Sequence, residues 1–256
     1  MSDKHDGEFY QEILDICLTA GRLMIEGGSE MYRVEDTMLR IARNAGAEDP
    51  RVFATPTCVF MSLNHGNLSQ MKQVRDRSID LELVDRVNAL SRQFAVKQID
   101  LPQLKEKIAK VADAPFFPMW MQSIGAAALS ATLMVLFMDN YDWLDFPGAA
   151  IVGGLGFWAY CEFKKYTKVR FLSELIAAMV MGFLAIGLNW LDSQMVVDNI
   201  LVGALMTLVP GLALTNALRD LFMGDLLSGI VRMCEAVLSA LALGGGVAIV
   251  LKFMGV

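Results

Sequence analysis

Apolar residues recur at steps of three and four in the first part of the chain, as on one face of a helix. This spacing predicts an amphipathic helix over residues 8–26, which Gly27 and Gly28 end. A second helix is expected over about 34–45, with Gly46 as its stop.

Two further helices are predicted in the same half. One covers about 81–94 and has Asp80 as its N-cap. The next begins at Asp100, where Asp100 and Gln103 have the spacing of a capping box. Residues 113–118 are the expected hinge to a more apolar half.

Between these two pairs of helices the pattern changes to that of strands. Residues 51–63 are β-branched, aromatic and apolar, which predicts a buried strand, and Pro56 within it indicates an edge or a bulge. The letters NHGN at 64–67 are a turn signal, and an alternating segment follows. We expect a hairpin over 52–75, so residues 1–114 form an α+β domain of helices plus a β-hairpin.

The second half, residues 115–256, consists mainly of long apolar runs. Its candidate membrane spans lie at roughly 118–138, 147–161, 171–191, 196–214 and 226–251. The second of them is short and rich in glycine, which favours a tilted or packed helix. The expected fold class is an α-helical polytopic membrane protein of five TM helices with an N-terminal cytosolic α+β domain.

Charges in the loops predict the orientation of these spans. Residues 139–146 hold three Asp and no Lys or Arg, and 191–195 hold only Asp192, whereas 162–170 hold three lysines and an arginine. The positive-inside rule puts 162–170 in the cytosol and the other two loops outside. The acidic N-terminus lacks the pattern of a signal peptide. We expect a multi-pass protein of the cell (inner or plasma) membrane, with its N-terminus cytosolic and its C-terminus outside.

The composition supports this division and excludes several functions. Of the 256 residues 55% are hydrophobic; the first 114 carry 15 Lys or Arg and 18 Asp or Glu, and the rest carry 7 and 10. No basic stripe is present, so nucleic acid is not an expected partner. The four cysteines lack metal spacing and no GxxxxGK[ST] pattern occurs, so we expect no metal, no cofactor and no intrinsic ATP hydrolysis.

Ionisable residues inside the spans are candidate functional groups, because a buried charge costs at least about 2.5 kcal/mol on insertion scales. Glu174 and Asp198 lie near predicted helix starts, where an anion also suits the helix dipole. Arg232 and Glu235 lie three residues apart on one face of the fifth span. A self-neutralising pair that only holds helices together is an open alternative for these two.

The segment LMTLVPGLALTNALRDLFMGD, residues 205–225, breaks an apolar run with Pro210 and Gly211 and then presents Asn216, Arg219 and Asp220. Transporters use such broken helices to bind substrate. The segment predicts a carboxylate site near Asn216 and Arg219, with Asp220 for a substrate amine or a coupling proton. A proline kink that ends the fourth span near the cytosol, with both charges solvated, is the alternative.

Two motifs resemble the threonine/serine exporter family. One is the GGSEMYRVED entry to the second helix, together with IDLELVDRVNALSR at 79–92; the other is LVPGLALTNALRDLFMGDLLSGIVR at 208–232. The resemblance covers nearly the whole chain. By motif it carries over the positions Glu30, Arg33, Glu35, Pro210, Gly211, Asn216, Asp220, Gly224, Gly229 and Arg232. Arg219 stands directly before Asp220, and the resemblance assigns no role to it.

The resemblance implies an exporter of small polar metabolites that works by secondary transport. Its substrate would be threonine or serine, or alternatively a dicarboxylate such as succinate. A proton would drive export, with Asp220 or Glu235 as the titrating group and Arg232 or Arg219 facing the substrate carboxylate. Full-length members look like fusions with a second, shorter membrane unit. The resemblance therefore implies the larger subunit of the split, two-gene form, in a hetero-oligomer with a short membrane subunit.

Two other classes of function stay open. A membrane-anchored enzyme would use the cytosolic domain, where Cys58 and His65 flank one hairpin as a conceivable nucleophile and base. A packed thiol and a turn histidine are the plainer interpretation of these two residues. A structural or regulatory membrane subunit without its own pathway is the other class.

Overall fold

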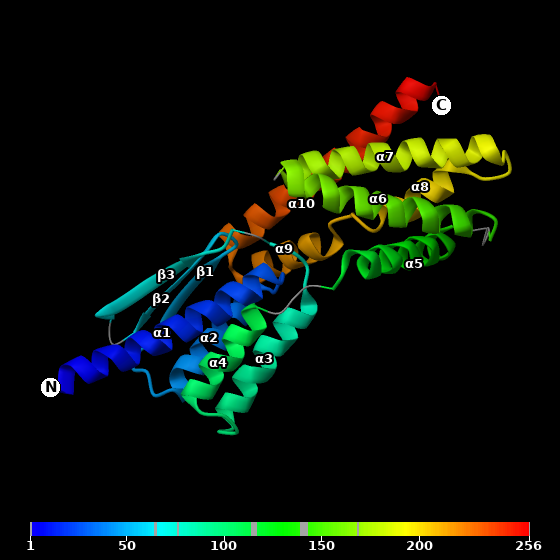
Figure 1. Cartoon of the computed structure of the whole chain (residues 1–256). Coiled ribbons are helices and arrows are strands. Elements are labelled where there is room, and N and C mark those ends of the chain that lie inside the picture. Colours follow the sequence, from blue (N-terminus) through cyan, green and yellow to red (C-terminus); the bar gives the residue numbers. More distant parts are fainter. Residues whose placement is uncertain are drawn as a thin grey trace. The chain divides into compact units, whose positions relative to one another are not determined.

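A computed structural model describes residues 2–63, 66–75, 77–113, 117–138, 143–167 and 169–255, with side chains from residue 7 onward. The chain forms two compact units (Figure 1). The first comprises Met1–Pro115 and Leu212–Cys234, and the second comprises Phe116–Gly211 and Glu235–Val256. A segment of the apolar half, 212–234, therefore groups with the N-terminal residues.

The first unit contains a sheet and two layers of helices. Its helices are α1 (Ser2–Glu26), α2 (Met31–Asn44), α3 (Leu81–Ala95), α4 (Leu101–Ala112), α9 (Gly211–Met223, from Leu212 onward) and the start of α10 (Leu226–Met254). Helix α1 packs against two strands on one side and against α3 and α4 on the other (Figure 1). The apolar faces of these elements form one core around fully buried side chains such as Ile13, Met24 and Met38.

Three helix boundaries predicted for this unit are confirmed by its hydrogen bonds, whereas α1 begins at Ser2 rather than at 8 and α2 at Met31 rather than at about 34. Helix α1 closes with Ser29 N–H donating to Met24 O at 2.9 Å, and Gly28 takes a φ of +85°, which favours glycine. Asp80 accepts from Leu83 N–H at 3.0 Å at the start of α3. The capping box at the start of α4 is present as expected.

The single strand predicted over 51–63 is wrong. Two antiparallel strands, β1 (Arg51–Thr55) and β2 (Cys58–Leu63), replace it, and β3 (Leu68–Gln73) completes a sheet of order β1-β2-β3. Pro56 cannot donate to a ladder, and it forms a turn with Thr57 that Thr55 closes through Oγ1, which accepts from Cys58 N–H at 3.1 Å. The NHGN turn lies partly outside the described residues.

The second unit is a bundle centred on α6 (Asp145–Thr167), which packs against α5 (Met119–Phe137), α7 (Arg170–Leu191) and α8 (Val197–Leu205). Small residues allow this close approach: a Cβ on Gly153 would lie 2.3 Å from Ser130 Cβ. Asp145, fully buried, accepts from Val196 N–H at 2.9 Å and from Asn199 Nδ2 at 2.8 Å.

Within the described residues, three helices are long and apolar enough to cross a membrane, namely α5, α7 and α10. Helix α6 extends the expected 147–161 span through most of the lysine-bearing loop. The span expected over 196–214 is interrupted, as a break in it was predicted, but the interruption begins before Pro210: α8 ends at Leu205 after about 14 Å of rise. The segment between α8 and α9 contains Pro210, which has no N–H to donate. The count of five spans stays a prediction.

Candidate functional site

The connection between α1 and α2, residues 27–30, is held tightly within the first unit. Asp80 N–H donates to Gly27 O at 3.0 Å, and a Cβ on Gly27 would lie 2.8 Å from Asp80 O. Ser29 and Glu30, the polar residues that follow the two glycines, are buried at 3% and 7% exposure. The glycine pair therefore permits a buried polar connection where larger residues would not fit.

Helices α9 and the start of α10 form a close hairpin in the same unit. Gly224 makes the turn with a φ of +94°, and Asp225 N–H donates to Asp220 O at 2.9 Å. A Cβ on Gly229 would lie 2.5 Å from Leu221 Cγ. The two glycines bring α10 close to α9, so the polar side chains of the two helices reach the same region.

This hairpin donates two hydrogen bonds to the backbone of the connection. Asn216 Nδ2 donates to Gly28 O at 2.8 Å, and Arg232 Nη2 donates to Ser29 O at 2.6 Å. Both acceptors are carbonyls near the end of α1, where helix carbonyls have no partner within the helix. Residues almost 190 positions apart in the sequence are thus joined at one point.

Asp220 is the centre of the cluster and is fully buried. Its Oδ1 accepts from Met31 N–H at 3.0 Å, and its Oδ2 lies 3.4 Å from Arg232 Nε. Glu30, the N-cap residue of α2, makes no capping bond with its own side chain, so Asp220 caps α2 from a distant part of the chain. Burial raises the pKa of Asp220, although Arg232 and the Met31 N–H act in the opposite direction.

Glu30 lies next to Asp220 and is shared by two arginines. Its Oε1 accepts from Arg219 Nη1, and its Oε2 accepts from Arg33 Nη1 at 3.3 Å. Burial acts to raise the pKa of Glu30, but backbone hydrogen bonding and the two guanidinium groups outweigh it, so the pKa lies below its ordinary value. Glu30 is therefore an anion at neutral pH.

The structure brings six of the predicted site residues into this cluster: Glu30, Arg33, Asn216, Arg219, Asp220 and Arg232. Glu35 contacts none of them in the hydrogen bonds described and accepts from Ala54 N–H on β1 at 2.9 Å, although the charge of Asp225 acts on both Glu35 and Asp220.

Pro210, Gly211 and Glu235 belong to the second unit. There the charge of Glu235 acts on Arg170, which also donates to Glu174 at 2.8 Å. Glu174 is 2% exposed and lies near the start of α7, where the sequence placed it.

Sequence reasoning missed the backbone groups of this site. Gly28 O, Ser29 O and Met31 N–H carry three of its contacts, and backbone groups leave no signal in side-chain type. It also missed Ser228, which is 2% exposed and donates to Ala54 O at 3.4 Å. A lone hydroxyl before Gly229 in an apolar run was the available signal.

The groups gathered here suit a carboxylate or an ammonium rather than a metal. Arginines and an amide donate, and a carboxylate accepts. Among the residues that the structure describes, no three His, Cys, Asp or Glu side chains could hold a metal ion together. Cys58 is partly buried on β2, and His65 lies outside the described residues.

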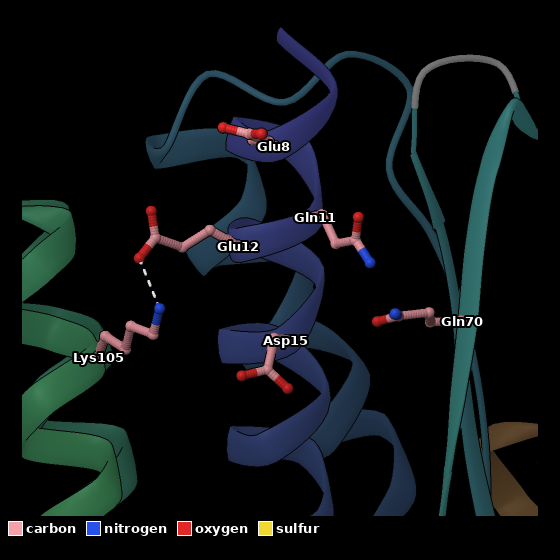
Figure 2. Close-up of a pocket in the computed structure, with 6 residues that line it drawn as sticks. All are labelled: Glu8, Gln11, Glu12, Asp15, Gln70 and Lys105. Atoms are coloured by element: carbon pink, nitrogen blue, oxygen red, sulfur yellow. Dashed lines mark hydrogen bonds and ion pairs between the residues drawn. The ribbon is translucent and has the colours of Figure 1, made fainter. Parts of the chain in front are cut away.

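A separate hollow of about 420 Å³ lies on the surface of the first unit (Figure 2). Its lining residues are Glu8, Gln11, Glu12, Asp15, Gln70 and Lys105. Lys105 donates to Glu12 at 2.8 Å across it, and Lys72 donates to Asp15 at 2.6 Å. These are ion pairs of a solvated surface, and none of the predicted site residues lines the hollow.

Buried charges in a chain with helices long enough to cross a bilayer are typical of membrane transport proteins. The chain belongs to the threonine/serine exporter (ThrE) family: residues 15–254 match the family described as "Putative threonine/serine exporter". No solved structure matches the chain.

Three relatives illustrate the family. "Probable threonine/serine exporter" of Mycobacterium tuberculosis is 20% identical over 247 residues, which are 94% of this chain and 46% of that protein. "Probable succinate transporter subunit YjjP" of Escherichia coli is 20% identical over 255 residues, 97% of each chain. "Pheromone-regulated membrane protein 10" of Eremothecium gossypii is 24% identical over 86% of this chain and 30% of its own length. The chain thus spans about half of the first relative and nearly all of the second.

Proposed function

We propose that this chain is the larger subunit of a membrane exporter that moves small carboxylate-bearing metabolites out of the cell by secondary transport. The observation that carries the proposal is the contact of the buried Asp220–Arg232 pair with the connection that precedes α2. Buried charges are costly unless they are paired, and in transport proteins they mark substrate or ion pathways.

The cluster holds the groups that recognition of an amino acid requires. Arg219, Arg232 and Asn216 are donors for a substrate carboxylate. Asp220 is an acceptor for a substrate ammonium or a site for a coupling proton. Since burial raises the pKa of Asp220, its protonation lies closer to cytosolic pH than that of an exposed aspartate. Glu235 is the second candidate for the titrating group.

The substrate is threonine or serine in the first instance, following the family. A dicarboxylate is the second candidate, and the Escherichia coli relative favours it because that match covers 97% of both chains. Both kinds of substrate have a carboxylate. Threonine or serine would place its ammonium against Asp220, whereas a dicarboxylate would place its second carboxylate against Arg33.

We further propose a multi-pass inner- or plasma-membrane protein with its N-terminus and first unit cytosolic and its C-terminus outside. The lysines of 162–170 and the acidic outer loops support this orientation. The site then opens toward the cytosol, where an exporter loads its substrate. Pro210 and Gly211 stand where the second unit gives way to the first, a position suited to a hinge.

The partner that we propose is a short membrane subunit of the same family, in a hetero-oligomer with this chain. The printed name of the Escherichia coli relative, a transporter subunit, supports this. Membership of a transporter family also argues against the membrane-anchored enzyme.

The test is efflux of labelled threonine and labelled succinate from cells that express this chain with and without a short partner. Asp220→Asn and Arg219→Gln should each abolish partner-dependent efflux. Arg219→Gln is the more informative of the two variants, because the Arg219 side chain is 49% exposed and its loss disturbs the fold less than loss of the buried Asp220. Arg40→Gln, an exposed ion-pair residue on α2, is the matched control. Efflux indifferent to both Arg219 and Asp220 would refute the assignment.

A further inference from the structure

Every group of the cluster that could recognise a substrate is bonded to the segment Gly28–Met31. Asn216 and Arg232 donate to the carbonyls of Gly28 and Ser29. Asp220 accepts from the N–H of Met31. The segment thus presents two carbonyl acceptors and one N–H donor to this hairpin of α9 and α10.

Glu30 completes this set with a carboxylate. It occupies Arg219 through one oxygen and Arg33 through the other. The Glu30 side chain is 9% exposed, whereas those of Arg219 and Arg33 are 49% and 40% exposed. An anion from solution can therefore reach the guanidinium groups of Arg219 and Arg33. In this structure both groups bind the carboxylate of Glu30 instead.

The charges around this position favour an anion even without Glu30. Three guanidinium groups, those of Arg33, Arg219 and Arg232, lie around two carboxylates, those of Glu30 and Asp220. When Glu30 turns away, Arg33 and Arg219 lose the carboxylate that they share next to the N-terminus of α2, where the helix dipole adds to the positive potential. Asp220 keeps its pair with Arg232 and also faces the charge of Asp225. A free carboxylate would restore the balance.

We propose that Glu30 is an internal competitor of the substrate: its carboxylate occupies Arg219 and Arg33, and a substrate carboxylate binds there by displacing it. This inference rests on the proposed function, in which the same cluster binds the substrate. The exchange replaces one carboxylate by another on the same donors, so it costs little net interaction energy. Glu30 would therefore set the affinity for the substrate. Release of the Glu30 side chain from the arginines would couple substrate binding to movement of the connection between α1 and α2.

The expected change in substrate affinity follows from the fraction of time that Glu30 occupies Arg219 and Arg33. If the arginines are free of Glu30 for less than about a tenth of the time, the apparent dissociation constant exceeds the intrinsic one by at least about tenfold. Glu30→Gln removes the competing charge and should therefore tighten carboxylate binding by about tenfold. A purely structural Glu30, which only ties α9 to the connection, predicts unchanged or weaker binding in the same variant.

The experiment is a titration of the purified full chain in detergent with succinate, and separately with threonine, by isothermal calorimetry. Glu30→Gln is compared with wild type, with Arg219→Gln, and with the Glu30→Gln/Arg219→Gln double variant. Glu82→Gln is the matched control, since it removes a carboxylate that pairs with an arginine, Arg86, on α3 outside the cluster. The proposal expects tighter binding by Glu30→Gln, wild-type binding by Glu82→Gln, and loss of the gain in the double variant.

Hydrogen exchange of wild type gives a second readout that needs no variant. Displacement of Glu30 by saturating succinate or threonine should speed exchange at the amides of Ser29 and Met31, whereas a purely structural Glu30 predicts no change or protection. Binding by Glu30→Gln equal to or weaker than wild type, or no binding by any form, would overturn the proposal. Efflux that depends on Arg219 would then still uphold the exporter. Tighter binding by Glu30→Gln without efflux would instead uphold the competitor and reject the exporter.

Discussion

Replacing Asp220 by asparagine should destabilise the first unit far more than loss of an exposed carboxylate does. Asp220 is fully buried and Arg232, its partner at 3.4 Å, is 8% exposed. The substitution keeps an oxygen for the Met31 N–H but removes the charge that faces Arg232. A buried guanidinium that has lost the carboxylate at 3.4 Å is therefore the main consequence.

The magnitude follows from the kind of contact that is lost. Removing one partner of a buried ion pair costs about 3–5 kcal/mol, and the Ser29 carbonyl that Arg232 retains favours the lower end, about 3 kcal/mol. Asp220→Ala also deletes the cap of α2, which adds about 1 kcal/mol. At about 4 °C per kcal/mol for a unit of this size, Asp220→Asn should lower the unfolding temperature by about 12 °C.

The assay uses Cys17, which is fully buried in the core of the first unit. In a background with Cys58, Cys161 and Cys234 replaced by serine, the temperature at which Cys17 reacts with a thiol probe reports unfolding of this unit.

Two comparisons make this measurement decisive. Asp36→Asn, which loses an exposed pair with Arg40 on α2, should change the temperature by less than about 3 °C. Adding Arg232→Gln to Asp220→Asn should recover at least half of the loss, because it removes the buried charge that has lost the Asp220 carboxylate. If Asp220→Asn fell within about 2 °C of Asp36→Asn, the burial and pairing described for Asp220 would be wrong.

Three further outcomes are expected. Because its pKa lies below its ordinary value, Glu30 contributes stability that is complete above about pH 4.3 and is lost as the pH falls through the lower folded-state pKa. The difference in unfolding temperature between wild type and Glu30→Gln, followed by circular dichroism, should therefore shrink from pH 7 to pH 3. Gly229→Ala should lower the free energy of unfolding by about 1–3 kcal/mol, because its Cβ would lie 2.5 Å from Leu221 Cγ. Gly244→Ala, on the same helix, places its Cβ in open space and should not lower it in the same unfolding assay. Asp145→Ala should leave two partly buried donors without their acceptor at about 1 kcal/mol each, seen as faster amide exchange at the start of α8, and the asparagine variant should lose about half as much.

The helices of the first unit were predictable because their signals are local. Gly28, Asp80 and Asp100 act on hydrogen bonds within a few residues, and all three appear where the sequence places them. The strand over 51–63 was predicted wrongly because composition does not show that Pro56 and Thr57 form a turn. A single prolyl residue is compatible with both an edge strand and a reversal.

The residues of the site were predictable, but their partners were not. A proline–glycine break followed by Asn216, Arg219 and Asp220 is unusual in an apolar run, so the chemistry was visible in the sequence. The pairing of Arg232 with Asp220, and of Glu30 with Arg219, joins positions separated by 12 and 189 residues. No spacing rule connects residues across such a distance.

By itself the sequence determined the division into a charged and an apolar half, the caps of α3 and α4, and the presence of charged and amide side chains beyond the proline–glycine break, because each is read from composition or from neighbours along the chain. Only the tertiary structure decided that 212–234 groups with the N-terminal unit and that Asp220 caps α2. The physical reason is that a buried charge requires a partner, and which partner reaches it depends on how the helices pack rather than on their order in the chain.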